Sequence, residues 1–135
     1  MKKILLFILF IGLAGAIAGW YYYNKPIGSL KDVDAAFQIS SDSLFAAYEM
    51  DEAAANSKFL DKTIEVYGKI LAVNTDTSGL SLTLQTGSDM FGVICKLEDK
   101  SLPETNFSIG QQILLKGQCT GYLMDVVLVR CSVVE

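Results

Sequence analysis

Residues 62–73 constrain the fold more than any other stretch, because their side chains alternate between apolar and polar and then become apolar on both faces. Successive strand residues point to opposite sides, so this pattern predicts a β-strand. One face carries Ile64, Val66, Gly68, Ile70 and Ala72. A glycine in the middle is typical of a first strand that bends to serve two sheets of a small barrel. An ordinary strand with an incidental glycine fits the stretch equally well.

The chain beyond this strand predicts four more strands separated by turns. Their expected inward-facing residues are Leu80, Leu82 and Leu84; Val93, Cys95 and Leu97; Ile113, Leu115, Gly117 and Cys119; and Val127, Val129, Cys131 and Val133, with Arg130 and Ser132 facing outward. Five strands with a long gap between the third and fourth match the OB-fold, a five-stranded Greek-key barrel. A sandwich or an open meander shares this alternation, so we predict a mainly β fold with the barrel as its favoured topology.

A short α-helical segment is expected directly before the first strand. Residues 40–43 offer several N-cap side chains, and residues 42–57 place apolar side chains at helical spacing. We predict one helix, or two helices separated near Asp51, because alanine and glutamate favour helices. The acidic residues Glu49, Asp51 and Glu52 are interpreted as a solvated helix face rather than a cation site.

The N-terminus carries an apolar run after Lys2 and Lys3. Residues 4–23 are 20 uncharged residues, about the length of a helix that spans a bilayer core. They form either a signal peptide cleaved after Ala18 or a signal anchor, which the four aromatic residues at 20–23 favour because aromatics gather at membrane interfaces. Residues 24–40 are then a linker, and residues 41–135 form the helix plus OB-fold domain. Both interpretations place this domain outside the cytoplasm, in the periplasm or at the cell surface.

Charge and composition argue against several classes of function. The eleven basic residues include Lys2 and Lys3, so nine face fifteen acidic residues beyond the apolar run, a net charge of −6. A domain of this sign is poorly suited to neutralising phosphate backbones. The chain has no histidine, the commonest general base and a usual ligand of catalytic zinc. Residues 74–79 imitate half of a calcium loop, but the twelfth position is Gln85, so we interpret them as a hairpin turn. We predict no catalytic residues, no cofactor and no metal site.

The cysteines are candidates for a disulfide. An antiparallel pairing centred on Asp125 would set Cys119 opposite Cys131, at a Cα separation of about 4.5 Å. That separation is within disulfide reach, and an exported domain permits oxidation. Cys95 on the third strand could compete for Cys131. Alternatively, all three cysteines are buried free thiols that act as small apolar residues.

Several motifs resemble the tRNA_anti-like family of OB-fold proteins. They are Tyr48-Glu49-Met50-Asp51-Glu52-Ala53-Ala54-Ala55-Asn56-Ser57-Lys58-Phe59-Leu60-Asp61-Lys62-Thr63-Ile64-Glu65-Val66-Tyr67-Gly68-Lys69-Ile70, Val93-Ile94-Cys95, Gly110, Lys116-Gly117-Gln118-Cys119-Thr120-Gly121 and Asp125-Val126-Val127-Leu128. Asn24-Lys25-Pro26 after an apolar N-terminus resembles anchored members. The chain departs from the pattern at Asp61, where glycine is common, and at Ile27, where histidine often follows the proline. The resemblance implies an OB barrel on a bacterial membrane anchor.

By analogy with other OB-folds, a ligand face would lie on the second and third strands and their loops. It would expose Ser81, Thr83, Gln85, Ile94 and Lys96, with Phe91 and Tyr67 as candidate stacking aromatics. We predict a membrane-anchored, extracytoplasmic binding or scaffold module with a protein or envelope partner. The alternative is a binder of single-stranded nucleic acid or oligosaccharide. Nucleic acid is less favoured because the face would be nearly neutral, whereas single-strand binders combine aromatics with a basic groove.

Overall fold

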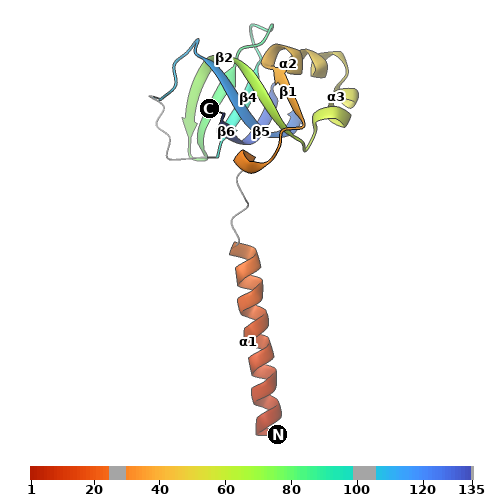
Figure 1. Cartoon of the computed structure of the whole chain (residues 1–135), viewed down its shortest axis with the longest axis vertical. Helices are drawn as coiled ribbons and strands as arrows, with labels where there is room; N and C mark the ends of the chain where they lie inside the picture. Colours follow the sequence, from red (N-terminus) through yellow and green to blue (C-terminus); the bar gives the residue numbers. More distant parts are fainter. Residues whose placement is uncertain (25–29, 99–105, 135) are drawn as a thin grey trace.

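The computed structural model describes residues 1–24, 30–98 and 106–134, so Lys25 and Pro26 of the family motif lie outside the described residues. It contains a long N-terminal helix, α1 (Lys2–Asn24), and a small β-barrel domain (Figure 1). The domain consists of η1 (Leu30–Asp32), β1 (Phe37–Ser40), α2 (Ser41–Met50), α3 (Glu52–Phe59), β2 (Thr63–Asp76), β3 (Gly79–Leu84), β4 (Val93–Leu97), β5 (Gln112–Tyr122) and β6 (Val126–Val133). Helix α1 is long and apolar enough to cross a membrane.

Five strands close into a barrel, which confirms the predicted OB-fold. The sheet order is β1-β2-β3-β4-β6-β5, and β2 also pairs with β5, so the sheet closes on itself. The β4–β6 pair is parallel, and the other four pairs around the barrel are antiparallel. The interior is filled by fully buried aliphatic side chains, among them Val66, Leu82, Leu84, Leu115 and Leu128.

Strand β2 serves both halves of the barrel, as its sequence predicted, but its irregularity lies beyond the glycine. Its N-terminal half pairs with β5 and its C-terminal half with β3. The register with β3 shifts between Ile70 and Ala72, so the bulge includes Leu71, whose side chain is exposed. Gly68 instead allows the side chain of Ser41 to pack closely against β2. A Cβ atom there would overlap the Oγ of Ser41, which donates a 2.6 Å hydrogen bond to the Gln85 carbonyl.

Substitution of Gly68 by alanine is therefore expected to lower the free energy of unfolding by about 1–3 kcal/mol, the usual cost of overpacking. The new methyl group must displace Ser41 and the first turn of α2. Urea unfolding followed by circular dichroism measures the loss. In a Ser41→Ala background, which removes the overlapping Oγ, Gly68→Ala should cost less. Equal costs in the two backgrounds would show that Ser41 is not the obstructing group.

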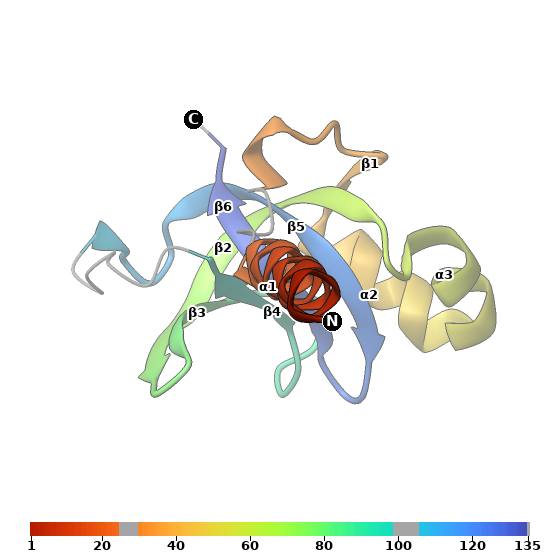
Figure 2. The ribbon, with the colours of Figure 1, turned by 90° about the horizontal axis from the view of Figure 1, so that it is seen from below.

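Asp51 separates α2 from α3, so of the two predicted alternatives, one helix or two, the structure has two helices. The Asp51 backbone is extended, and its carboxylate accepts a 3.0 Å hydrogen bond from the Ala54 amide, so it caps the N-terminus of α3. Ser40 caps α2 in the same way by accepting from the Ser43 amide at 3.1 Å. The two helices bury Leu44, Phe45, Tyr48, Ala55 and Phe59 in the hydrophobic core. Figure 2 shows α2 and α3 together on one flank of the barrel.

The facing of β6 differs from the prediction. The buried residues are Val126, Leu128, Cys131 and Ser132, whereas Val127, Val129 and Val133 are only partly buried. The pattern changes at Arg130, which has a left-handed φ of 54° and lies where the registers with β4 and β5 both shift. The extra residue turns Cys131 inward, because a bulge breaks the strict alternation of a strand. Ser132 lies opposite Lys116 on the outer face, as predicted, and is buried on the side where η1 contacts β5 and β6.

The predicted disulfide between Cys119 and Cys131 is wrong. All three cysteines are free and buried. Cys119 lies opposite Leu128, because the hairpin pairs Tyr122 with Val126 and its register then shifts twice along β5 and β6. A pairing centred on Asp125 with unbroken register does not occur. The alternative prediction, three buried thiols, describes this structure.

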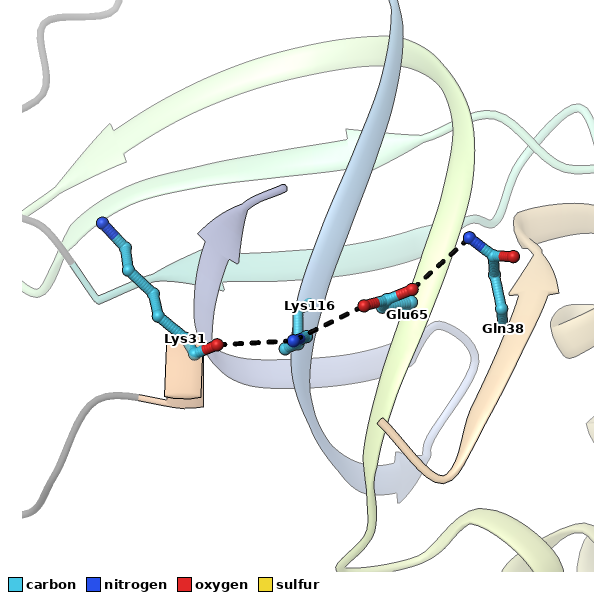
Figure 3. Close-up of polar contacts among 4 residues, drawn as sticks. All are labelled: Lys31, Gln38, Glu65 and Lys116. Carbon is cyan, nitrogen blue, oxygen red and sulfur yellow. Dashed lines mark hydrogen bonds and ion pairs between the residues drawn. The ribbon is translucent and has the colours of Figure 1, made fainter. Parts of the chain in front are cut away.

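Part of residues 24–40, which were predicted to be a linker, is folded onto the barrel. Strand β1 pairs in parallel with β2, and η1 lies against β5 and β6. A chain of polar contacts fastens both elements (Figure 3). The Lys116 ammonium lies 3.4 Å from the Lys31 carbonyl oxygen and 3.5 Å from Glu65, which also accepts a 3.4 Å hydrogen bond from the Gln38 amide. Residues 30–40 are therefore part of the folded domain.

Candidate binding surfaces

Four of the seven residues predicted for the ligand face come together on β3 and β4. The antiparallel register sets Ser81 opposite Lys96 and Thr83 opposite Ile94. Their strand neighbours Leu82, Leu84, Val93, Cys95 and Leu97 are buried in the core, so these four side chains lie on the outer surface of the barrel. The Lys96 side chain is exposed, and the other three are partly buried. The result is a small, mixed surface with one cation among these four residues.

The other three predicted residues lie elsewhere. Tyr67, which is 44% exposed, belongs to the part of β2 that pairs with β5. Together with Gln85 it lines a hollow of about 400 Å³ beside the start of α2. Phe91 is partly buried and packs against the core, and its carbonyl accepts a 2.6 Å hydrogen bond from Thr86. Neither aromatic ring therefore joins the four residues on β3 and β4 as a stacking platform.

The β2–β3 connection beside this surface is a hairpin turn, as predicted. Asp76 pairs with Gly79, whose φ of 129° suits glycine. The Ser78 hydroxyl and amide both donate hydrogen bonds to the Asp76 carboxylate, and they hold its pKa below its ordinary value. Within residues 1–24, 30–98 and 106–134, no group of three or more His, Cys, Asp or Glu side chains could hold a metal ion.

A more apolar groove lies between α3 and the β5–β6 hairpin. Its volume is about 480 Å³, and its lining residues are Glu52, Asn56, Leu60, Thr120, Gly121, Tyr122, Leu123 and Val127. Leu123 at the hairpin tip is 89% exposed, and Leu60 and Met124 are exposed as well. Gly121 has a positive φ of 116°, and a Cβ atom there would lie at an ordinary contact distance of 3.6 Å from the Leu60 side chain. We call these lining residues the hairpin groove.

The floor of the hairpin groove is held by an aromatic cluster. The Tyr122 ring stacks on Tyr48 with centroids 5.6 Å apart and meets the edge of Phe45 at 6.0 Å. Tyr48 is buried, and its hydroxyl oxygen lies 3.3 Å from the Cys119 sulfur. The groove therefore rests on well-packed core residues.

Sequence reasoning missed this groove, although one signal was available. Tyr122, Leu123 and Met124 are three consecutive apolar residues at a tight turn, where polar residues and glycine are the rule. Tyr122 packs against the core, but Leu123 and Met124 are exposed, and adjoining exposed apolar side chains mark an interaction site. The contribution of α3 could not be read from sequence, because it depends on tertiary packing.

The likeness to one solved structure supports the fold. The structure resembles the crystal structure of a putative nucleic acid-binding lipoprotein from Klebsiella pneumoniae subsp. pneumoniae MGH 78578, with a TM-score of 0.56 and 18% sequence identity, over 74% of this chain and 93% of that chain. A putative aspartyl-tRNA synthetase from Leishmania major Friedlin matches 87% of this chain and 25% of that chain, with a TM-score of 0.40 and 13% identity. No curated protein sequence matches this chain significantly.

The family model described as tRNA_anti-like matches residues 1–133. The match therefore includes the apolar helix and all strands of the barrel. The motifs in residues 48–70 that resembled this family form the end of α2, all of α3 and the first half of β2, and those in residues 116–128 lie in the β5–β6 hairpin. This chain belongs to the tRNA_anti-like family.

Proposed function

We propose that this protein is a membrane-anchored binding module that holds its OB barrel outside the cytoplasm and recruits a protein or envelope partner through the hairpin groove. The observation that carries the proposal is the groove itself, which combines exposed leucines with a well-packed floor. Exposed apolar surface of this kind costs solubility and is typical of an interaction site.

The anchor and its short tether support the location. Lys2 and Lys3 precede α1, and basic residues before an apolar helix favour the cytoplasmic side, so the barrel would follow on the opposite side. Helix α1 ends at Asn24 and η1 begins at Leu30, which is buried against the domain. Five intervening residues span at most about 20 Å even when extended. The η1 side of the barrel would thus stay close to the bilayer.

The charge of the domain supports a protein partner over nucleic acid. Beyond the apolar run the chain carries a net charge of −6. The acidic residue Glu52 lines the hairpin groove. Lys96 lies on the β3–β4 surface, whereas the two predicted stacking aromatics lie elsewhere, Phe91 against the core and Tyr67 on the part of β2 that pairs with β5. Affinity for nucleic acid arises largely from phosphate neutralisation, which this distribution of charge opposes. A partner with an apolar side chain beside a basic group would complement the groove.

Photo-crosslinking in living cells tests this proposal. A photoreactive amino acid at Leu123 is expected to yield protease-sensitive adducts from the membrane fraction, whereas the same group at Lys96 should yield few. Leu60→Ser, which makes the groove wall polar, should reduce the Leu123 adducts several-fold, since most binding energy resides in a few buried apolar contacts. An exposed control, Glu49→Gln on α2, should leave the adducts unchanged.

The alternative function is supported by one observation, the gathering of Ser81, Thr83, Ile94 and Lys96 on the outer surface of β3 and β4. This is where other OB-folds bind oligonucleotides and oligosaccharides. The same experiment separates the two functions. Nuclease-sensitive or glycan-containing adducts at Lys96, with none at Leu123, would replace the groove proposal by this alternative.

A further inference from the structure

Two of the three cysteines are neighbours in the barrel interior. Cys95 in β4 and Cys131 in the adjacent strand β6 have exposed fractions of 0% and 1%. Cys95 of β4 pairs with Leu128 of β6, and the next pair is Leu97 with Cys131. Between these two pairs β4 advances by two residues and β6 by three. The additional residue forms the bulge at Arg130. With a regular register Cys131 would face outward, because strand side chains alternate. The bulge therefore turns Cys131 towards the side of the sheet that holds Cys95.

Cys131 lies near Cys95, since both side chains are buried on the core side of adjacent strands. The neighbouring Cys95 thiol, with burial as a second cause, raises the pKa of Cys131 well above its ordinary value. Gly117 in β5, the other neighbour of β6, leaves space for the Cys131 sulfur, since a Cβ atom at Gly117 would overlap that sulfur. Cys119 is engaged elsewhere, with its sulfur beside the Tyr48 hydroxyl. Cys95 is thus the thiol neighbour of Cys131.

We propose that Cys95 and Cys131 form a disulfide bond when this chain folds in an oxidising compartment. The oxidant is a small-molecule or protein disulfide. One cysteine thiolate attacks it, one thiol leaves, and the second cysteine displaces the other thiol from the mixed disulfide. The cysteines lose two protons and two electrons, and the oxidant is reduced to two thiols. Both sulfurs are buried in the folded barrel, so the exchange occurs before β4 and β6 close.

This bond would be structural. It would join the parallel pair β4–β6 and close a loop that includes the whole connection from β4 to β5. Once folded, a buried disulfide is protected from attacking thiolates, whose access determines the rate of exchange. The cross-link would keep the two strands paired when the remainder of the barrel loosens.

Peptide mapping of the full-length, detergent-solubilised protein tests the Cys95–Cys131 pairing independently of the compartment in which the protein resides. The protein is equilibrated with oxidised and reduced glutathione in enough urea to open the barrel, returned to buffer, and alkylated. The expected result is a Cys95–Cys131 linked peptide, about 2 Da lighter than the two reduced peptides together, with Cys119 alkylated. Cys119→Ala should retain the link, and Cys95→Ala should abolish it. A link that contains Cys119, or alkylation of all three cysteines, would overturn the proposal.

A second arm separates this inference from the proposed location. Thiols are trapped by alkylation in intact cells before the membrane fraction is isolated. A Cys95–Cys131 link in that sample supports both the pairing and an oxidising compartment. If the link forms with glutathione but is missing in cells, the pairing is supported and the extracytoplasmic location is refuted.

Discussion

Replacement of Tyr48 by alanine is expected to lower the free energy of unfolding by about 3–5 kcal/mol, the usual loss for a buried aromatic residue. Tyr48 is 1% exposed and joins α2 to the barrel. Its ring packs on Phe59 and stacks on Tyr122, and its hydroxyl oxygen lies 3.3 Å from the Cys119 sulfur. Alanine would leave a cavity beneath both helices and beneath the hairpin groove.

Tyr48→Phe is the matched control, because it removes only the hydroxyl group. We expect a loss of about 1 kcal/mol, the typical net value of one hydrogen bond. The control should also change how the stability of the protein depends on pH. Burial, with the hydrogen bond to Cys119 as a second cause, raises the pKa of Tyr48 above its ordinary value. An unfolded tyrosine ionises at about pH 10, so this contribution to stability is present below that pH and is lost as pH rises above it.

Urea unfolding of the full-length protein in detergent, followed by circular dichroism at neutral pH and above pH ~10, measures these effects. The loss of stability at alkaline pH should be smaller in Tyr48→Phe than in the parent protein. A Tyr48→Ala variant as stable as Tyr48→Phe would show that the ring is not packed between α2 and the barrel.

Leu128→Ala is expected to lower the free energy of unfolding by about 2–5 kcal/mol. Leu128 is fully buried at the centre of β6, opposite Cys119 of β5 on one side and Cys95 of β4 on the other. Alanine would open a cavity between three strands that the barrel cannot collapse to fill. Val127→Ala, one residue earlier and only partly buried, should cost less than about 1 kcal/mol, since it loses part of one exposed aliphatic group.

This pair of variants also decides the facing of β6. The alternation read from the sequence placed Val127 inside the barrel, whereas the structure places Leu128 there. The denaturant midpoints of the two variants compare their stabilities, provided that the dependence of the unfolding free energy on denaturant is unchanged. A Val127→Ala variant less stable than Leu128→Ala would restore the facing that regular alternation predicts.

Local chemistry explains why much of the fold could be predicted. The inward residues of β3, β4 and β5 followed strict alternation, because these strands have one face on the core along most of their length. A break near Asp51 was one of two predicted alternatives, and it occurs because the Asp51 side chain suits an N-cap better than a helix interior. Family motifs then selected the OB topology among folds that share this alternation.

The predicted ligand face shows where such reasoning weakens. Alternation placed Ser81, Thr83, Ile94 and Lys96 on one outer surface, since they belong to a regular antiparallel pair. It could not place Tyr67 relative to them, because β2 changes its partner from β5 to β3 along its length. The hairpin groove was missed for a related reason. Its two walls come from α3 and from a hairpin about 60 residues later, and no local rule relates them.

The sequence by itself determined the apolar helix, the helical segment before the barrel, the five barrel strands and the net negative charge, because each depends on composition or on the spacing of neighbouring residues. Only the tertiary structure decided which cysteines meet, which residues of β6 face the core, and where the apolar groove lies. These features depend on the bulge at Arg130 and on the register between strands. A single added residue reverses the facing of every later side chain, and packing against both neighbouring strands selects where that residue is accommodated.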